Sequence, residues 1–149
     1  MREGGRVENL YIPGQAGSFP TPTADFDASN GVLAITGESH PEDAATFYAP
    51  LILWLETFTA GPPRRVSLEL RLTFFSNTTR SQLLALLRRL SAFAGRGAEV
   101  RATWQVDPDD DDMVDTVADF EAMSGLKIEV VRASAPPEGS PTREQRAGV

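Results

Sequence analysis

The chain contains no cysteine and only one histidine, His40. The lack of cysteine excludes disulfides, thiol catalysis, iron–sulfur clusters and the usual structural zinc sites. A single imidazole also excludes metal sites that need several histidines. No uninterrupted apolar run exceeds five residues, which is too short to span a bilayer, and the N-terminus lacks the apolar stretch of a secretory signal. We therefore expect a cytoplasmic protein with no membrane partner, no cofactor and no metal.

The length of 149 residues suits one domain with a single core. Hydrophobic residues make up 41% of the chain and charged residues 23%, which is typical of a folded protein that is not embedded in a membrane. Proline, glycine, serine and mixed charge dominate the end of the chain. We predict a flexible N-terminus over residues 1–7, a single domain over 8–132 and a disordered tail over 133–149.

The formal net charge of −7 reflects an uneven placement of acids. Residues 107–121 hold eight acids and no base, and outside this run 13 acids face 14 bases. Residues 70–98, in contrast, carry five arginines and no acid. An acidic chain lacks the broad basic footprint that nucleic acids require, so no nucleic-acid partner is expected.

Alternating apolar and polar residues predict three strands, which begin at Val66, Val100 and Leu126. Two further strands, over 19–27 and 32–38, flank Asn30-Gly31, a strong short signal for a hairpin. The short apolar stretch at residues 10–12 is either an edge strand or an ordered lead-in. The chain is therefore expected to open with antiparallel strands.

Apolar residues at spacings of three and four predict three amphipathic helices. The helices are expected between residues 39 and 60, between 76 and 95 to 97, and over 111–123. Ser39 is a candidate N-cap of the first helix, and Pro50 is expected to kink it or to mark a looser first turn.

These elements follow the order ββαβαβαβ, and strand–helix–strand repeats imply parallel pairs with right-handed crossovers. The strands that begin at Val66, Val100 and Leu126 each keep a polar face, unlike the strands of a doubly wound sheet. We predict an α/β fold of the two-layer α+β kind, in which helices pack mainly on one face of a mixed sheet. Helices or a partner covering the polar face remain alternatives.

His40 is the natural candidate for a general base, but it lies beside Pro41 at a predicted helix start, where a surface or capping histidine is the simpler interpretation. The chain also has no phosphate-cradling glycine loop, nucleotide-binding fingerprint or nucleophile elbow. We predict that the protein is not an enzyme. A carboxylate site within residues 107–119 is the enzymatic alternative.

Four consecutive carboxylates precede the third predicted helix: Asp109, Asp110, Asp111 and Asp112. They suit the positive end of a helix dipole, and they also suit a basic docking surface on a partner. Calcium loops space their acids at alternate positions around a glycine, a pattern that is absent here. Dipole stabilisation, acidic docking and, least favoured, a metal site are the three interpretations.

The corner at Asn77-Thr78-Thr79 lies where an amphipathic strand turns into an amphipathic helix. Free backbone N–H groups and the helix dipole favour a phosphate at such a corner, and Arg80 follows directly. An ordinary helix cap is the simpler interpretation. The residues alone do not single out one hydroxyl.

Four segments carry a family resemblance: Glu8-Asn9-Leu10-Tyr11-Ile12, Gly37-Glu38-Ser39-His40-Pro41-Glu42, Phe75-Ser76-Asn77-Thr78-Thr79 and Asp109-Asp110-Asp111-Asp112-Met113. Their order resembles the bacterial SiaC family, which has a lead-in strand, a Gly-Glu-Ser-Tyr-Pro-Glu-Asn turn, an Asn-Thr-Ser-Ser corner and an acidic run with methionine. The resemblance covers about residues 8–131. His40 stands where the family prefers tyrosine, and the corner reads Asn-Thr-Thr-Arg.

The resemblance implies a STAS-like fold, similar to anti-sigma-factor antagonists, and a signalling switch. In the family a protein kinase phosphorylates the threonine of the corner, which falls on Thr78, and a PP2C-type phosphatase removes the phosphate. The unphosphorylated form binds and activates a diguanylate cyclase, and so controls cyclic-di-GMP and biofilm formation. On this hypothesis the corner forms the partner-binding surface: Asn77, Thr78, Thr79, Arg80 and Ser81. A phosphorylation-independent adaptor of the same fold is the alternative.

Overall fold

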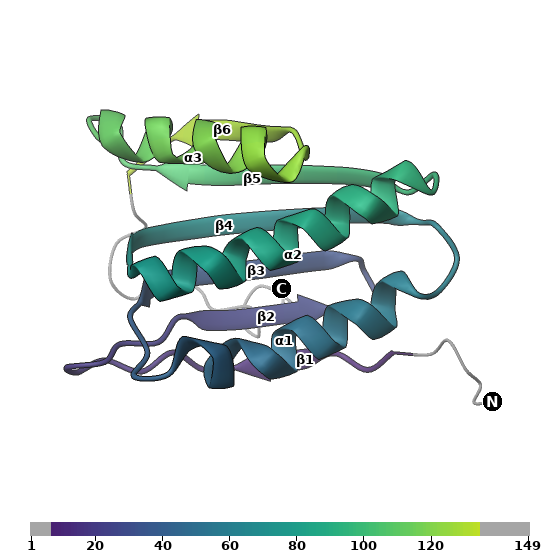
Figure 1. Cartoon of the computed structure of the whole chain (residues 1–149), viewed down its shortest axis with the longest axis horizontal. Helices are drawn as coiled ribbons and strands as arrows, with labels where there is room; N and C mark the ends of the chain where they lie inside the picture. Colours follow the sequence, from purple (N-terminus) through teal and green to yellow (C-terminus); the bar gives the residue numbers. More distant parts are fainter. Residues whose placement is uncertain (1–6, 135–149) are drawn as a thin grey trace, which may run out of the picture.

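The computed structural model describes residues 7–134. Most of the predicted flexible N-terminus, 1–7, and of the predicted tail, 133–149, lies outside these residues. Within 7–134 the chain forms six strands and three helices (Figure 1). The strands are β1 (Leu10–Ile12), β2 (Thr23–Asp27), β3 (Val32–Ser39), β4 (Arg65–Phe75), β5 (Glu99–Val106) and β6 (Ile128–Arg132). The helices are α1 (Ala44–Thr59), α2 (Asn77–Gly95) and α3 (Asp111–Ser124).

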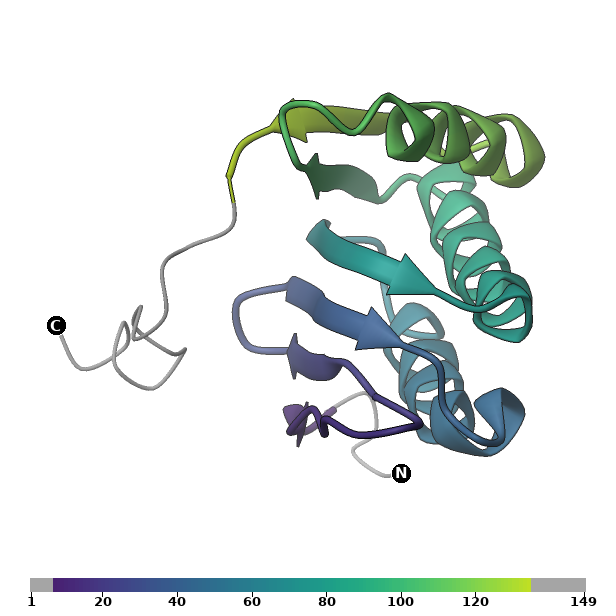
Figure 2. The same cartoon turned by 90° about the vertical axis from the view of Figure 1, so that its left-hand side faces the viewer.

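The six described strands form one mixed sheet in the order β1-β2-β3-β4-β5-β6. The pairs β1–β2 and β2–β3 are antiparallel, whereas β3, β4, β5 and β6 run parallel to one another. All three helices pack on the same face of this sheet (Figure 2). The predicted two-layer fold is confirmed.

The structure has one strand more than the predicted order, because residues 10–12 form the edge strand β1. Leu10 and Ile12 lie opposite Phe26 and Ala24 of β2 and pack against the core. The indole Nε1 of Trp54 in α1 donates to the carbonyl oxygen of Glu8 at 2.7 Å. These contacts show that residues 10–12 form an edge strand. The three apolar residues alone did not distinguish an edge strand from an ordered lead-in.

The first helix begins later than predicted, and Ser39 is not its cap. Ser39 is the last residue of β3, pairs with Phe75 of β4 and is fully buried. The N-cap of α1 is Asp43, whose carboxylate accepts from the Thr46 backbone N–H at 3.2 Å. The parallel pairing with β4 therefore extends β3 through the predicted capping position. The helix continues through Pro50 to Thr59.

The core lies between the sheet and the three helices. Its largest fully buried side chains include Trp104 of β5, Tyr48 of α1, Phe93 of α2 and Phe120 of α3. On β4 the apolar residues that alternate in the sequence, from Val66 to Leu72, are all buried toward the helices. Alternation in the sequence thus becomes one apolar face as far as Leu72. Phe74 belongs to the same alternation but is half exposed, because the pairing of β3 with β4 shifts register between Leu72 and Phe74.

The second face of the sheet carries polar residues, and no helix of residues 7–134 covers it (Figure 2). Glu69, Arg101 and Glu129 are exposed there. The prediction of helices mainly on one face therefore holds, and helices over the polar face are excluded for the described part of the chain.

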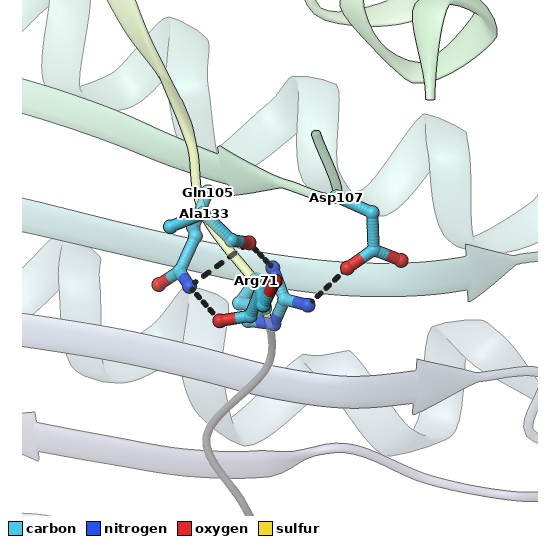
Figure 3. Close-up of polar contacts among 5 residues, drawn as sticks. Arg71, Gln105, Asp107 and Ala133 are labelled. Atoms are coloured by element: carbon cyan, nitrogen blue, oxygen red, sulfur yellow. Dashed lines mark hydrogen bonds and ion pairs between the residues drawn. The ribbon is translucent and has the colours of Figure 1, made fainter. Parts of the chain in front are cut away.

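Arg71 on β4 departs from this polar pattern because it is buried, with 8% of its surface exposed. Its guanidinium pairs with Asp107 Oδ1 at 2.6 Å and donates to the carbonyl oxygen of Ala133 at 3.4 Å (Figure 3). Gln105 Nε2 donates to the carbonyl oxygens of Ala133 and Ser134 at 3.4 and 3.2 Å. The chain that leaves β6 thus passes over β5 and β4 and covers Arg71.

None of the helices among residues 7–134 has the length and apolar character needed to cross a membrane.

Candidate functional site

Three strand-to-helix corners lie along one rim of the sheet. The strands β3, β4 and β5 are parallel neighbours, so their carboxyl ends, and the helices that follow them, meet at the same edge (Figure 1). The N-caps at this rim are Asp43 for α1, Ser76 for α2 and Asp110 for α3. The rim therefore brings the predicted threonine corner and the acidic run into neighbouring positions.

The corner before α2 presents Thr78 to solvent. Ser76 is the N-cap, and its hydroxyl accepts from the Thr79 backbone N–H at 3.2 Å. Asn77, Thr78 and Ser81 are exposed. The Thr78 Oγ1 lies 3.1 Å from Ser76 Oγ. The Thr78 hydroxyl is thus accessible at the first turn of the helix.

Thr79 must be removed from the predicted partner-binding surface, because it is fully buried. Its hydroxyl donates to the main-chain carbonyl oxygen of Ser39 at 3.1 Å and lies 2.9 Å from the Ser39 hydroxyl. Ser76 donates to the same Thr79 oxygen at 3.1 Å. Adjacent residues on a helix point in different directions, so Thr79 turns inward where Thr78 turns outward.

A third element joins this contact through Tyr48 of α1. The Tyr48 hydroxyl lies 2.8 Å from Ser39 Oγ, and both residues are fully buried. Burial raises the pKa of Tyr48 to about 12. The α2 corner is therefore tied to β3 and α1 by buried hydroxyl groups.

Tyr48→Phe is expected to change how stability depends on pH in the alkaline range. The unfolded chain loses this phenol proton near pH 10, whereas the folded protein retains it to about pH 12. The wild-type free energy of unfolding should therefore fall by up to about 3 kcal/mol from this group as pH rises through that window. Urea unfolding at pH 9 to 12 should show the fall in wild type and in Tyr11→Phe, and a smaller fall in Tyr48→Phe. Equal curves for all three proteins would contradict the prediction.

Arg80 is half-buried and lies across the aromatic side chains between α2 and α3. Its guanidinium carbon is 5.8 Å from the ring centre of Phe75 and 5.3 Å from that of Phe120. Both distances are in the range of cation–π contacts. The sequence predicts that Arg80 lies next to a phosphate site. In the structure its guanidinium instead packs against Phe120 of α3.

Two of the four consecutive carboxylates at residues 109–112 have structural partners. Asp110 caps α3 by accepting from the Met113 backbone N–H at 3.0 Å. Asp111 pairs with Arg132 at 2.9 Å. Asp109 and Asp112 are exposed. Within residues 7–134 no group of three or more histidines, cysteines or acids is arranged to hold a metal ion.

Asp110→Ala is expected to lower the free energy of unfolding by about 1 kcal/mol, because it removes the N-cap of α3. Asp109→Ala, one residue earlier and outside the cap, serves as the matched control and should change stability by less than about 0.5 kcal/mol. Urea denaturation at neutral pH would measure both. Equal losses would show that the run acts through its total charge and not through the cap.

His40 belongs to an aromatic cluster that the sequence did not indicate. Its ring stacks on Phe19, with ring centres 6.2 Å apart, and lies 5.9 Å from the ring centre of Phe74. Both phenylalanines are about half exposed. The His40 Nδ1 has no hydrogen-bond partner among the described residues. Since a general base needs a group that orients it, this arrangement favours a packing role.

Two surface hollows lie away from the rim. One, of about 290 Å³, is lined by residues around the end of α1, including Phe58, Pro62 and Arg64. The other, of about 410 Å³, lies between the lead-in segment and α1, where Leu53 and Trp54 line it. Neither hollow includes a residue of the Thr78 corner or of the acidic run.

The family whose sequence model matches this chain is described as SiaC family regulatory phosphoprotein, and the match covers residues 15–133. An uncharacterised protein of Pseudomonas aeruginosa strain UCBPP-PA14 is 26% identical over 114 residues, which are 76% of this chain and 88% of the relative.

Solved structures from Pseudomonas aeruginosa show the same fold. The crystal structure of apo-SiaC has a TM-score of 0.76 and 24% identity, covering 84% of this chain and 99% of that one. SiaC in the crystal structure of the diguanylate cyclase SiaD with its activator SiaC has a TM-score of 0.77 and 24% identity. That match covers 83% of this chain and 99% of the neighbour.

Proposed function

Because this chain belongs to the SiaC family of regulatory phosphoproteins, we propose that it is a non-enzymatic switch protein. In this proposal its unphosphorylated form binds and activates a partner protein, and phosphorylation of Thr78 stops that binding. The functional unit is the single domain over residues 8–132.

The exposure of Thr78 is the observation that carries the proposal. Thr78 lies at the first turn of α2 with its hydroxyl accessible, whereas the neighbouring Thr79 is fully buried. A kinase must bring the hydroxyl oxygen in line with the γ-phosphorus of its nucleoside triphosphate. An exposed side chain at the rim of a small domain meets that requirement.

We propose a diguanylate cyclase as the partner, with cyclic-di-GMP and biofilm control as the output. The support is the fold shared with Pseudomonas aeruginosa SiaC, which activates the diguanylate cyclase SiaD in the complex of those two proteins. A dedicated protein kinase and a PP2C-type phosphatase complete the proposal.

The partner-binding surface of the proposal is the exposed rim around Thr78. It comprises Asn77, Thr78 and Ser81, with Arg80 at its border. The exposed carboxylates of Asp109 and Asp112 lie on the neighbouring corner and offer a docking site for basic residues of the partner. In this proposal both parts of the rim contact the same partner.

Phosphopeptide mapping of the protein isolated from its own host tests the proposal. We expect one phosphate, on Thr78, that a PP2C-type phosphatase removes and that the Thr78→Ala protein never acquires. If the peptide carrying Thr78 stays unmodified under every growth condition, the switch is wrong, and a phosphorylation-independent adaptor becomes the better description.

A further inference from the structure

The buried hydroxyl groups behind Thr78 form a chain across three elements. Tyr48 comes from α1, Ser39 from the end of β3, and Thr79 from the first turn of α2. All three side chains are fully buried. The oxygen atoms of Tyr48 and Ser39 are 2.8 Å apart, and those of Ser39 and Thr79 are 2.9 Å apart.

The direction of each hydrogen bond follows from the number of hydrogens available. A hydroxyl has one hydrogen and two lone pairs. The hydrogen of Thr79 goes to the carbonyl oxygen of Ser39, which can only accept. The Ser39 hydroxyl must then donate to Thr79, and Tyr48 must donate to Ser39.

The second lone pair of Thr79 is also used, because Ser76 donates to it at 3.1 Å. The Thr79 oxygen therefore has no free lone pair and no contact with solvent. Thr78, one residue earlier, differs on both counts. It is exposed, and among residues 7–134 its hydroxyl contacts only Ser76, at 3.1 Å. Since the Ser76 hydrogen goes to Thr79, Thr78 is the donor in that contact.

We infer that the chain Tyr48–Ser39–Thr79 is a specificity device, in which these positioning residues withhold Thr79 from phosphorylation and leave Thr78 as the acceptor. The inference rests on the proposed function. Phosphoryl transfer joins the threonine oxygen to the γ-phosphorus of the kinase's nucleoside triphosphate, releases the nucleoside diphosphate and passes the hydroxyl proton to a base of the kinase. That attack needs a free lone pair and an approach path, and Thr79 gains both only when the first turn of α2 opens locally.

The first experiment maps phosphate in variants of the full chain expressed in its own host. Thr78→Ala should carry no phosphate on Thr79. Adding Ser39→Ala removes one donor from Thr79. The population of the locally open turn should then rise by about tenfold, as expected for one lost hydrogen bond, and phosphate should become detectable on Thr79. Tyr48→Phe in the same background should act in the same direction but less. Tyr11→Phe, at the chain's other tyrosine, which is exposed, is the matched control.

Phosphate on Thr79 in the wild-type protein, or in Thr78→Ala alone, would overturn the inference while leaving a phosphorylated switch in place. Absence of phosphate from both threonines of the wild-type protein would instead contradict the proposed function.

A second measurement decides the inference without a kinase. Amide hydrogen exchange at Thr79, followed by NMR, reports the same local opening of the first turn. We expect exchange about tenfold faster in Ser39→Ala, from the loss of one hydrogen bond, and unchanged in Tyr11→Phe. Unchanged exchange in Ser39→Ala, in a protein whose circular dichroism matches wild type, would show that the hydroxyl chain does not hold the corner closed.

Discussion

Phosphate on Thr78 is expected to weaken the partner complex by about thirty- to a thousand-fold, which corresponds to about 2–4 kcal/mol. The reason is a mismatch at the rim. A partner surface that accommodates the neutral Thr78 hydroxyl would have to bury an unpaired phosphate dianion, and uncompensated charge is strongly unfavourable in an interface. The phosphate also adds bulk at an exposed corner of the molecule.

Isothermal titration with the proposed cyclase partner would measure this effect on unmodified, phosphorylated and Thr78→Ala protein. Thr78→Ala should bind as the unmodified protein does and should resist the kinase. Thr73→Ala is the matched control, because Thr73 is exposed on β4, outside the corner. Loss of binding in Thr78→Ala together with retained binding in Thr78→Asp would reverse the polarity of the switch.

The second large effect concerns Phe120, the buried aromatic residue of α3. Phe120→Ala should lower the free energy of unfolding by about 3–5 kcal/mol, through lost burial and the cavity left behind. The ring stacks on Trp104 with centres 5.4 Å apart and also lies beneath the Arg80 guanidinium. Its loss therefore loosens the contact between α3 and the first turn of α2 as well as the core.

Phe74→Ala provides the control for this prediction, since Phe74 is the same residue type but half exposed on β4. Its removal should lower stability by less than about 1 kcal/mol. Urea denaturation of both variants gives the comparison. A loss at Phe74 as large as that at Phe120 would mean that the aromatic cluster around His40 contributes to stability as strongly as the core does.

The succession of strands and helices could be predicted because burial on one side imposes a period. The alternation along β4 and the three-and-four spacing along α1 both describe a side that faces the core. Residues 10–12 are too few to show an alternation that identifies a strand. Their pairing with β2 and the contact of Trp54 with Glu8 show that they form one.

The site was only partly predictable. Local sequence indicated a helix cap at a hydroxyl-rich corner, but it treated Thr78 and Thr79 as equivalent. Their difference depends on Ser39 and Tyr48, which are distant in sequence from the corner. Contacts between remote segments leave no periodic signal in a single chain, so the burial of Thr79 becomes visible only in the fold.

Arg71 illustrates the same limit on the polar face of the sheet. The alternation along β4 predicts that Arg71 lies on the polar face and is exposed, and Arg71 does lie on that face. The residue is nevertheless buried, because Asp107 and the carbonyl oxygen of Ala133 surround its guanidinium. No feature near Arg71 in the sequence points to either partner.

The three helices that start at the rim differ in the charge at their N-termini. The helices α1 and α3 begin at the carboxylates of Asp43 and Asp110, whereas α2 begins at the neutral Ser76 and has no acid in its first turn. Negative charge at this end of a helix is stabilising. A phosphate on Thr78 would therefore give α2 the charge that its neighbours carry permanently. The phosphorylated protein should then stay folded. Hydrolysis of the phosphate would be enough to restore the unmodified, partner-binding form, without new synthesis or refolding.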